Sequence, residues 1–521
     1  MRRSIMLFTL ALAASCRTAA PPSATDLILV NGKVFTADEA RPWAAAVAIR
    51  GDRITAVGDN EDVRALAGPG TRIIDAAGRT IVPGINDAHV HQPWDVAVGY
   101  DLPIGEAASV DDLIAAVTAA AGSRPAGTLL RGDIPLQHLD DPRFTRDTLD
   151  RIAPGHLVRL GHIGDHSMLM NTAALRAWDI AETASDPPGG WFARRDGRLT
   201  GWAYEHATWA RLAGDVLARS DEELVASLRV FANEAVRMGI TSVQTMPPGD
   251  GARLSRLAAR TGVPLRWRWI DFQMARIADD PRSPVKYILD GTPLERGAAL
   301  ISDYADRPAH RGRVNYSDVE IARLVETAGR GKAPLLLHIS GDLTLEKVLR
   351  AMQGVNADWP SRRVRIEHGD FILPFLEDAK RLGVVLVQNP SHLMLPAVMS
   401  ARIGAERLPS FQALRTPIER GLPVALGSDG PLSPWLNVMF ATMHPTNPSE
   451  AISREQAVVA YTRGSAYAEF TERDKGMIAP GKLADLAVLS QDVFTVPTQA
   501  LPATESILTI IGGKVVYEKT N

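Results

Sequence analysis

The chain has 521 residues, of which 45% are hydrophobic and 22% charged, and its formal net charge is −3. This composition is typical of a globular protein with ample apolar residues for a packed core. A net charge so close to zero argues against a surface that binds a polyanion, so we expect no nucleic acid partner.

The first residues have the pattern of an export signal. Two arginines precede an apolar run over residues 5–14, which is shorter than the roughly 20 residues that span a bilayer. The run ends in Ala-Ala-Ser-Cys16, which resembles a bacterial lipobox. We expect residues 1–16 to be a signal peptide and Cys16 to carry a lipid that anchors the exported protein at the membrane, facing the periplasm or the cell exterior. Plain cleavage nearby is the alternative, and residues 17–25 would form a tether.

Cys16 is also the only cysteine in the chain. The folded body therefore has no intrachain disulfide, no thiolate nucleophile and no cysteine ligand for a metal. A thiolate that bridges two metal ions is excluded in the same way.

Short strand patterns occur at both ends of the folded body. Between residues 26 and 82, alternating apolar residues are punctuated by Asn-Gly and Gly-Asp turns, as in a small antiparallel sheet. The stretches 484–489 and 507–517 have the same character. We expect residues 26–82 and 476–521 to build one composite β-sandwich domain.

Eight apolar runs, most of them followed by a helical pattern, occupy the middle of the chain. Strands that alternate with helices pair in parallel, and eight such units are typical of a (β/α)₈ TIM barrel. We therefore predict an α/β fold with this barrel over residues 83–475. The predicted strands are 81–85, 240–245, 265–270, 285–289, 334–338, 364–368, 384–388 and 423–427.

The gap between the first two predicted strands, about 92–237, is too long for a loop and predicts an inserted subdomain. Residues 110–121 in this gap have helical periodicity. Ser220 and Glu223 form the pattern of a capping box, which predicts that a helix starts directly after Ser220.

Polar residues stand at or just past the ends of the predicted strands, where the catalytic groups of barrel enzymes come together. His89 and His91 are spaced i and i+2, so both imidazoles point the same way on an extended backbone and suit one metal ion. Lys286 lies near the start of its run. The other residues at strand ends are Gln244, His338, His368, Gln388 and Asp429.

Together these fragments resemble the amidohydrolase superfamily and, within it, amidohydrolase family 3, which includes N-substituted formamide deformylases and YtcJ-like proteins. The resemblance extends from about residue 26 to the C-terminus. It rests on residues 83–91, 165–175, 201–205, 285–291 and 427–429 and on His338, Glu367, His368 and Gln388.

The resemblance implies a divalent metal centre, commonly zinc, with one or two ions. Lys286 would be carbamylated and so become an anionic oxygen donor that bridges the ions. Hydroxide formed at the metal would attack a carbonyl, while Asp429 would bind metal or water and carry the proton to the leaving nitrogen. The implied histidine ligands are His89 and His91 for one ion and His338 and His368 for the second.

The resemblance also implies substrate contacts. His166 and Asn171 match a Gly-His-x-x-x-x-Asn pattern of the family, although Asp165 stands in place of the glycine. Apart from the resemblance, we expect His162, Glu205 and Gln388 to add polar contacts, and Trp94 and Trp202 to form an apolar wall.

We therefore predict a metal-dependent hydrolase of C–N bonds other than peptide bonds, with a linear N-acyl or N-formyl amine or amino acid as its small-molecule substrate. Hydrolysis of a carboxyl ester or phosphotriester, and an inactive binding protein on the same barrel, are the alternatives. Gly341, three residues after His338, stands where mononuclear adenosine-type deaminases have a glutamate, which argues against that reaction. The membrane would be a partner only through the lipid anchor, and a homo-oligomer is left open.

Overall fold

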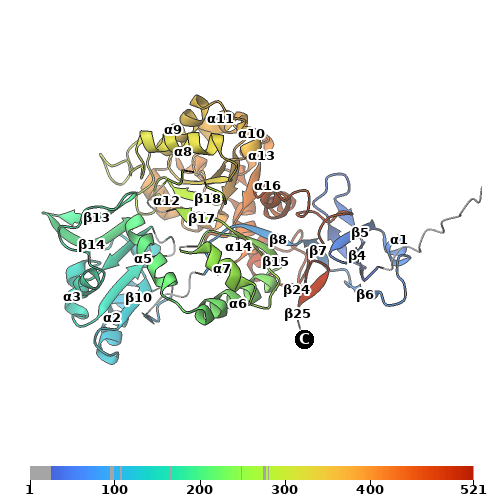
Figure 1. Cartoon of the computed structure of the whole chain (residues 1–521), viewed down its shortest axis with the longest axis horizontal. Helices are drawn as coiled ribbons and strands as arrows, with labels where there is room; N and C mark the ends of the chain where they lie inside the picture. Colours follow the sequence, from blue (N-terminus) through green and yellow to red (C-terminus); the bar gives the residue numbers. More distant parts are fainter. Residues whose placement is uncertain are drawn as a thin grey trace, which may run out of the picture.

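The structure, a computed structural model, describes residues 25–93, 99–105, 108–162, 164, 166–247, 249–273, 277–279 and 281–519. The predicted signal peptide, the tether up to residue 24 and Trp94 lie outside these residues. The described chain has a mixed α/β fold, in which strands and helices alternate along much of the sequence (Figure 1). None of its helices is long and apolar enough to cross a membrane.

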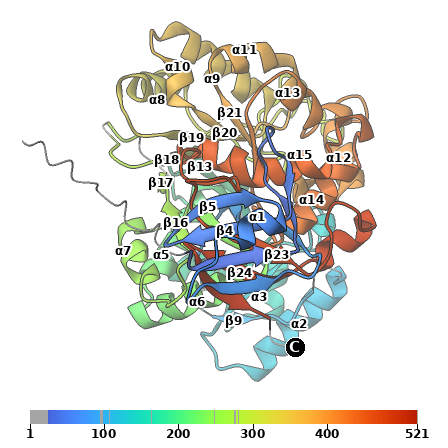
Figure 2. The same cartoon turned by 90° about the vertical axis from the view of Figure 1, so that its right-hand side faces the viewer.

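Two sheets lie at one end of the molecule, and the second of them combines strands from both ends of the chain (Figures 1 and 2). The first has the order β5 (Arg53–Gly58), β4 (Ala46–Arg50), β1 (Leu27–Val30), β6 (Arg72–Asp75). The second has the order β25 (Lys514–Glu518), β24 (Ser506–Ile511), β23 (Leu486–Leu489), β7 (Thr80–Pro83), β2 (Lys33–Phe35), β3 (Trp43–Ala44).

A shared apolar core joins these two terminal sheets. Leu29 and Val47 from the first sheet are fully buried with Ile81, Leu486 and Ile510 from the second. Strand β7 pairs in parallel with β2 and antiparallel with β23, so N-terminal and C-terminal strands lie side by side in one sheet. The two ends of the chain are therefore held together by both packing and backbone hydrogen bonds.

Two parallel sheets form the middle of the molecule. Most of their strands are completely buried, as expected when both faces of a parallel sheet are covered. The two exceptions, at one edge of each sheet, are residues 266–269 and 271–273, which are partly exposed. The first has the order β16 (Arg266–Trp269), β15 (Ile240–Thr245), β8 (Ile85–Val90). The second has the order β17 (Asp271–Gln273), β18 (Val285–Ile288), β19 (Leu335–Ile339), β20 (Arg365–His368), β21 (Val385–Gln388), β22 (Val424–Leu426).

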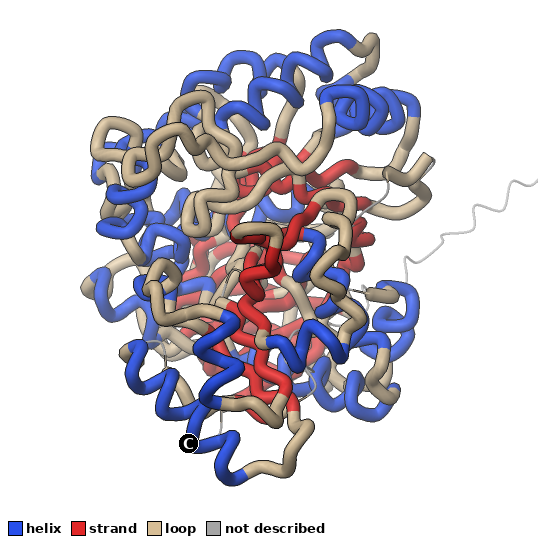
Figure 3. The backbone as a smooth tube through the Cα atoms, turned by 90° about the vertical axis from the view of Figure 1, so that its left-hand side faces the viewer, coloured by secondary structure: helices blue, strands red, loops and turns tan. Residues whose placement is uncertain are grey.

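Helices cover the strands from outside (Figure 3). The longest of those that follow the parallel strands are α8 (Asp318–Arg330), α9 (Asp342–Gly354) and α14 (Pro434–Met443), while α6 (Asp221–Arg237) precedes β15. The predicted capping box at the start of α6 is confirmed: Ser220 Oγ accepts from the Glu223 amide, and the Glu223 carboxylate accepts from the Ser220 amide.

The first predicted strand of the middle region, 81–85, is wrong in its position. Residues 81–83 belong to β7 in the terminal sheet, and the strand that pairs with β15 starts at Ile85. Gly84 allows the close passage from one sheet to the other, because a Cβ atom there would lie 2.2 Å from Thr241 Oγ1. His89 consequently lies within β8 and not beyond its end.

A further sheet comes from the residues between β8 and β15, and it lies at the lower left of Figure 1. Its core is separate and is closed by α2 (Val110–Ser123), where helical periodicity was predicted over 110–121, and by α3 (Arg146–Ile152). Its order is β13 (Gly190–Arg195), β14 (Arg198–Glu205), β12 (Ser167–Met170), β11 (Leu157–Gly161), β10 (Leu129–Asp133), β9 (Tyr100–Asp101).

Candidate functional site

A cavity of about 580 Å³ lies at the carboxyl ends of the parallel strands. Residues from the two parallel sheets and from the β9–β14 sheet contribute to its wall. Five of the metal ligands predicted from the sequence line this cavity: His91, Lys286, His338, His368 and Asp429. The sixth, His89, lies directly behind His91.

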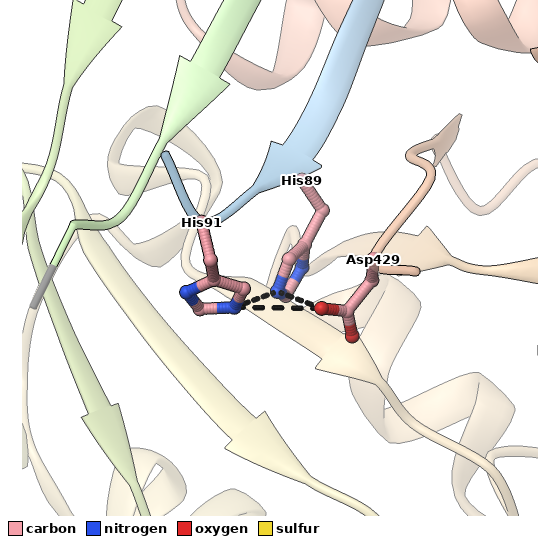
Figure 4. Close-up of side chains that lie close together, drawn as sticks. All are labelled: His89, His91 and Asp429. Atoms are coloured by element: carbon pink, nitrogen blue, oxygen red, sulfur yellow. Dashed lines mark hydrogen bonds and ion pairs between the residues drawn. The ribbon is translucent and has the colours of Figure 1, made fainter. Parts of the chain in front are cut away.

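Three of these side chains converge on one point (Figure 4). His89 Nε2 and His91 Nε2 lie 3.5 and 3.4 Å from the same carboxylate oxygen of Asp429, Oδ1. The two imidazole nitrogens are only 3.2 Å apart. The strand spacing of His89 and His91 and the loop after β22 thus bring three potential ligand atoms together.

Hydrogen bonds behind the two histidines fix which ring nitrogens face inward. His89 Nδ1 lies 2.7 Å from Glu367 Oε2, and His91 Nδ1 lies 2.8 Å from the main-chain carbonyl of Met246. A carbonyl oxygen and an ionised carboxylate only accept, so both Nδ1 atoms donate and both Nε2 atoms carry lone pairs. Outer partners of this kind orient the histidine ligands of metal ions.

Lys286 lies against the same pair of nitrogens. Its Nζ atom is 2.8 Å from His89 Nε2 and 3.4 Å from His91 Nε2, and the residue is 1% exposed. Burial lowers the pKa of Lys286 to about 8, although the Asp429 carboxylate opposes this shift. The lone pairs of His89 Nε2 and His91 Nε2, only 3.2 Å apart, repel each other unless a cation lies beside them, either this ammonium group or a metal ion.

The second oxygen of Asp429 faces a different pair of histidines. His368 Nε2 and His392 Nε2 each lie 3.6 Å from Asp429 Oδ2. His338 is close by, with its ring centroid 4.4 Å from that of His368. The buried atoms His338 Nε2 and His368 Nδ1 have no hydrogen-bond partner in the described part of the chain. These imidazole nitrogens and the Asp429 carboxylate oxygen fit a divalent metal ion, because zinc takes both kinds of atom as ligands.

His392 was missed in the sequence analysis. It lies in the short 3-10 helix η3 (Pro390–Met394), four residues beyond Gln388, the last residue of β21. The signal for it was an additional histidine in the loop after a predicted strand, but Gln388 at the strand end was singled out instead.

Two site residues have left-handed backbone conformations. His368 has φ 70° and Asp429 has φ 38°, and each such strain costs about 1–3 kcal/mol. Asp87 fixes the backbone just before Asp429, because its carboxylate accepts hydrogen bonds from the Ser428 amide at 2.8 Å and from the Ser428 hydroxyl. The Asp429 amide donates to the His89 carbonyl at 2.9 Å, so Asp429 and His89 are fixed to each other through the backbone.

Gly427 allows this close approach, and we expect Gly427→Ala to disrupt it. The added Cβ would lie 2.5 Å from both the amide nitrogen and the Cβ of His89, atoms that cannot move aside. We expect a loss of about 1–3 kcal/mol in the free energy of unfolding, together with a loss of bound metal. Gly430→Ala is the control, because its nearest neighbouring atom is 3.6 Å away. Equal stability and metal content in the two variants, measured by denaturant unfolding and elemental analysis, would contradict this account.

A buried ion pair supports His89 from behind. Arg365 donates to Glu367 at 2.8 and 3.1 Å, to the Ala88 carbonyl at 2.8 Å and to Gln244 Oε1. Burial alone would raise the pKa of Glu367, but Arg365 and His89 lower it to about 2. The carboxylate is therefore ionised at neutral pH and holds His89 in one tautomer.

Two of the predicted substrate contacts, His162 and His166, line the cavity. His166 Nδ1 lies 3.1 Å from both carboxylate oxygens of Glu205, and His162 Nε2 lies 2.5 Å from Glu295 Oε1. Burial favours a neutral His166, but the Glu205 carboxylate outweighs it and raises the pKa to about 9. Two histidines of the wall are thus each backed by a carboxylate.

The other predicted substrate contacts do not line the cavity as far as the described chain shows. Glu205 lies behind His166, and Asn171 caps helix α4 (Thr172–Ala177) through its side chain. Gln388 is fully buried, and Trp202 packs against the core beside α2. Trp94 lies outside the described residues.

Trp209, which was not singled out in the sequence, forms an aromatic part of the wall. Its ring centroid lies 5.2 Å from that of His166 and 6.0 Å from that of His91. Leu294 and Phe411 continue an apolar surface, while Arg131 and Arg159, neighbours on β10 and β11, add polar groups. The cavity therefore combines apolar walls with a few polar groups, as small-molecule sites do.

The chain is similar in sequence to known proteins over most of its length. A family model described as Amidohydrolase family matches residues 72–517. The N-substituted formamide deformylase of Arthrobacter pascens is 28% identical, with 95% of this chain and 99% of that protein covered. A protein of Bacillus subtilis (strain 168) named amidohydrolase YtcJ is 27% identical, with 94% of this chain and 99% of that protein covered.

A solved structure supports the same fold. An uncharacterized metal-dependent hydrolase from Pyrococcus horikoshii OT3 superimposes with a TM-score of 0.69 and 21% identity, over 91% of this chain and 99% of that one. The family match covers most of the chain, and the resemblance inferred from its motifs is confirmed. The chain belongs to the amidohydrolase family.

Proposed function

We propose that this protein hydrolyses the C–N bond of linear amides, with N-formyl or N-acyl amines and amino acids as its substrate class. The observation that carries the proposal is the Asp429 carboxylate, which lies between histidine nitrogens whose lone pairs face a substrate-sized cavity. The similarity to a protein named N-substituted formamide deformylase supports an amide as the substrate.

The histidines and Asp429 would hold a divalent metal ion, which we propose to be zinc. When bound, such an ion lowers the pKa of a water molecule and polarises a carbonyl group. Asp429 would accept the proton of the attacking water and deliver it to the leaving nitrogen, since its carboxylate faces both histidine pairs. His166, whose Nδ1 faces Glu205, would donate a hydrogen bond to the substrate through Nε2. His162, whose ring nitrogens face the Gly164 amide and Glu295, would shape the wall beside the substrate.

Lys286 would serve this centre as a carbamate. Its Nζ atom lies within 3.4 Å of two nitrogens that would bind a metal ion, where an ammonium group would repel the ion. Carbamylation turns the group into an anionic oxygen donor. We expect metal-free protein to regain more activity with zinc and bicarbonate than with zinc alone, and Lys286→Met to remove both the activity and this difference. Recovery that is independent of bicarbonate would contradict the modification.

We further propose that the two parallel sheets close into one (β/α)₈ barrel. Only Ile270 separates β16 from β17, and at the other edges the Asp429 amide donates to the His89 carbonyl. An experimental structure in which β22 and β8 are not neighbours would contradict this closure.

The substrate proposal is tested with the full-length protein, purified with zinc and bicarbonate. It is offered N-formyl amines, N-acyl amines, N-acyl amino acids, simple esters and a phosphotriester, and the release of amine, alcohol or phosphate is followed. We expect amine release from a subset of the amides, loss of this activity on chelation and its recovery with zinc. Hydrolysis of esters or phosphotriesters without any amide would overturn the assignment, as would metal-bound protein inactive on the whole panel.

A further inference from the structure

The two oxygens of Asp429 point to two separate groups of nitrogens. Oδ1 lies 3.5 and 3.4 Å from the Nε2 atoms of His89 and His91, and Oδ2 lies 3.6 Å from the Nε2 atoms of His368 and His392. Within each group, the three ligand atoms lie within 4.8 Å of one another. His338 belongs to neither group, although the resemblance to amidohydrolases implies it as a ligand of the second ion.

We infer that His392 is a metal ligand, and that His368, His392 and Asp429 Oδ2 form a second metal position bridged to the first by the Asp429 carboxylate. This inference rests on the proposed function only in that both need a metal centre. It assigns a ligand from the loop after β21, and it makes Asp429 a link between the two positions.

The position of His392 favours this role. Helix η3 brings its ring to 5.4 Å from the His368 ring, centroid to centroid, with the two planes only 23° apart. Parallel rings whose Nε2 atoms are equally far from one carboxylate oxygen can direct both lone pairs at an ion beside that oxygen. His392 also lines the cavity, and its side chain is 33% exposed, so an ion or a substrate can reach it.

One competing contact defines what binding requires. His392 Nε2 lies 3.1 Å from the main-chain carbonyl of Asp429, to which it donates when the ring proton is on this nitrogen. Binding a cation places the proton on Nδ1 instead, and the exposure of the side chain allows Nδ1 to donate to water. The switch costs one neutral hydrogen bond, which the metal–nitrogen bond replaces.

Backbone placement supports the second position as well. Ser391, next to His392, is held by two hydrogen bonds. Its amide donates to Asn437 Oδ1 at 2.7 Å, and its hydroxyl donates to the Ser428 carbonyl at 3.1 Å. The second bond ties η3 to the residue before Asp429. His392 and Asp429 are therefore held at a fixed separation, as two ligands of one ion must be.

The test counts metal ions in the full-length protein. The chain is stripped with a chelator, reconstituted with bicarbonate and excess Zn²⁺ or Co²⁺ and desalted. Bound metal is measured by mass spectrometry, with the visible spectrum of the Co²⁺ form as a second readout. We expect two ions per chain in the wild type, one in His392→Ala and two in His338→Gln. His138→Gln serves as the control and should also bind two, because His138 is neither in one of the two ligand groups nor among the residues that line the cavity.

Each outcome decides the matter. Two ions in His392→Ala, or only one in the wild type, would overturn the second position. One ion in both His392→Ala and His338→Gln would retain His392 as a ligand and add His338 as another. Thermal unfolding of each variant shows whether it is folded. Amide hydrolysis is assayed separately, so a chain that binds two ions without hydrolysing amides would contradict the proposed function and leave this inference standing.

Discussion

Replacing Asp429 by asparagine is expected to reduce kcat/KM for an amide substrate by about 10²- to 10⁴-fold, the range for loss of an acid–base group. Asparagine has nearly the same shape as aspartate, but it cannot accept the proton of an attacking water. It also offers only one oxygen, so it cannot face both histidine pairs as the two carboxylate oxygens do. We therefore expect the bound metal to fall from two ions to one, measured on the same preparation as the kinetics.

The control for this loss is Asp133→Asn. Asp133 lies at the end of β10 and lines the same cavity, but it faces neither pair of metal-binding histidines. We expect its kcat/KM to stay within about tenfold of the wild type. An Asp429→Asn protein with near-normal turnover would remove Asp429 from the proton transfer.

Glu367→Gln is expected to have the largest effect on stability. It removes the negative charge beside Arg365, whose side chain is 1% exposed, and leaves that guanidinium buried without a counter-ion. Breaking a buried pair in this way costs about 3–5 kcal/mol in the free energy of unfolding. Metal affinity should also fall by about 10- to 100-fold, since His89 loses the carboxylate that orients its ring.

The effect on stability should depend on pH in one direction. The pKa of Glu367 is lowered to about 2 in the folded protein, below the value of about 4.3 in an unfolded chain. Its contribution is therefore complete above about pH 5 and is lost as the pH falls toward 2. Unfolding curves at pH 7 and pH 3.5 should show a smaller difference between wild type and variant at the lower pH.

The matched control is Glu234→Gln, which weakens an ion pair whose side chains are 34% and 41% exposed. Exposed pairs contribute about 1 kcal/mol or less. A loss as small for Glu367→Gln as for Glu234→Gln would show that the buried pair does not stabilise the fold.

The parts of this site that the sequence predicted are those with strong local patterns. His89 and His91 are two residues apart on a strand, so their common direction follows from β geometry alone. His338 and His368 end apolar runs that were predicted to be buried strands, and Asp429 follows another. These residues meet because parallel strands end at one edge, a consequence of topology that strand–helix alternation reveals.

Other features depend on tertiary contacts that have no local pattern. His392 reaches the site through a 3-10 turn, whose direction is fixed by Ser391 bonding to Ser428 far along the chain. Asn171 has the spacing of a family motif, yet its side chain caps a helix. The division between β7 and β8 was also missed, since the apolar run over residues 81–85 continues through the point where the chain changes sheets.

That change of sheet links the candidate metal-binding residues to the two ends of the chain through a short stretch of backbone. Only Gly84 separates β7, which is held between β2 and β23, from the strand that carries His89. Fraying of the C-terminal strands would therefore be transmitted along a nearly rigid backbone to the first ligands. The terminal sheets and the strands around the cavity should consequently unfold in a single cooperative transition, so pairing of the two chain ends stabilises the cavity.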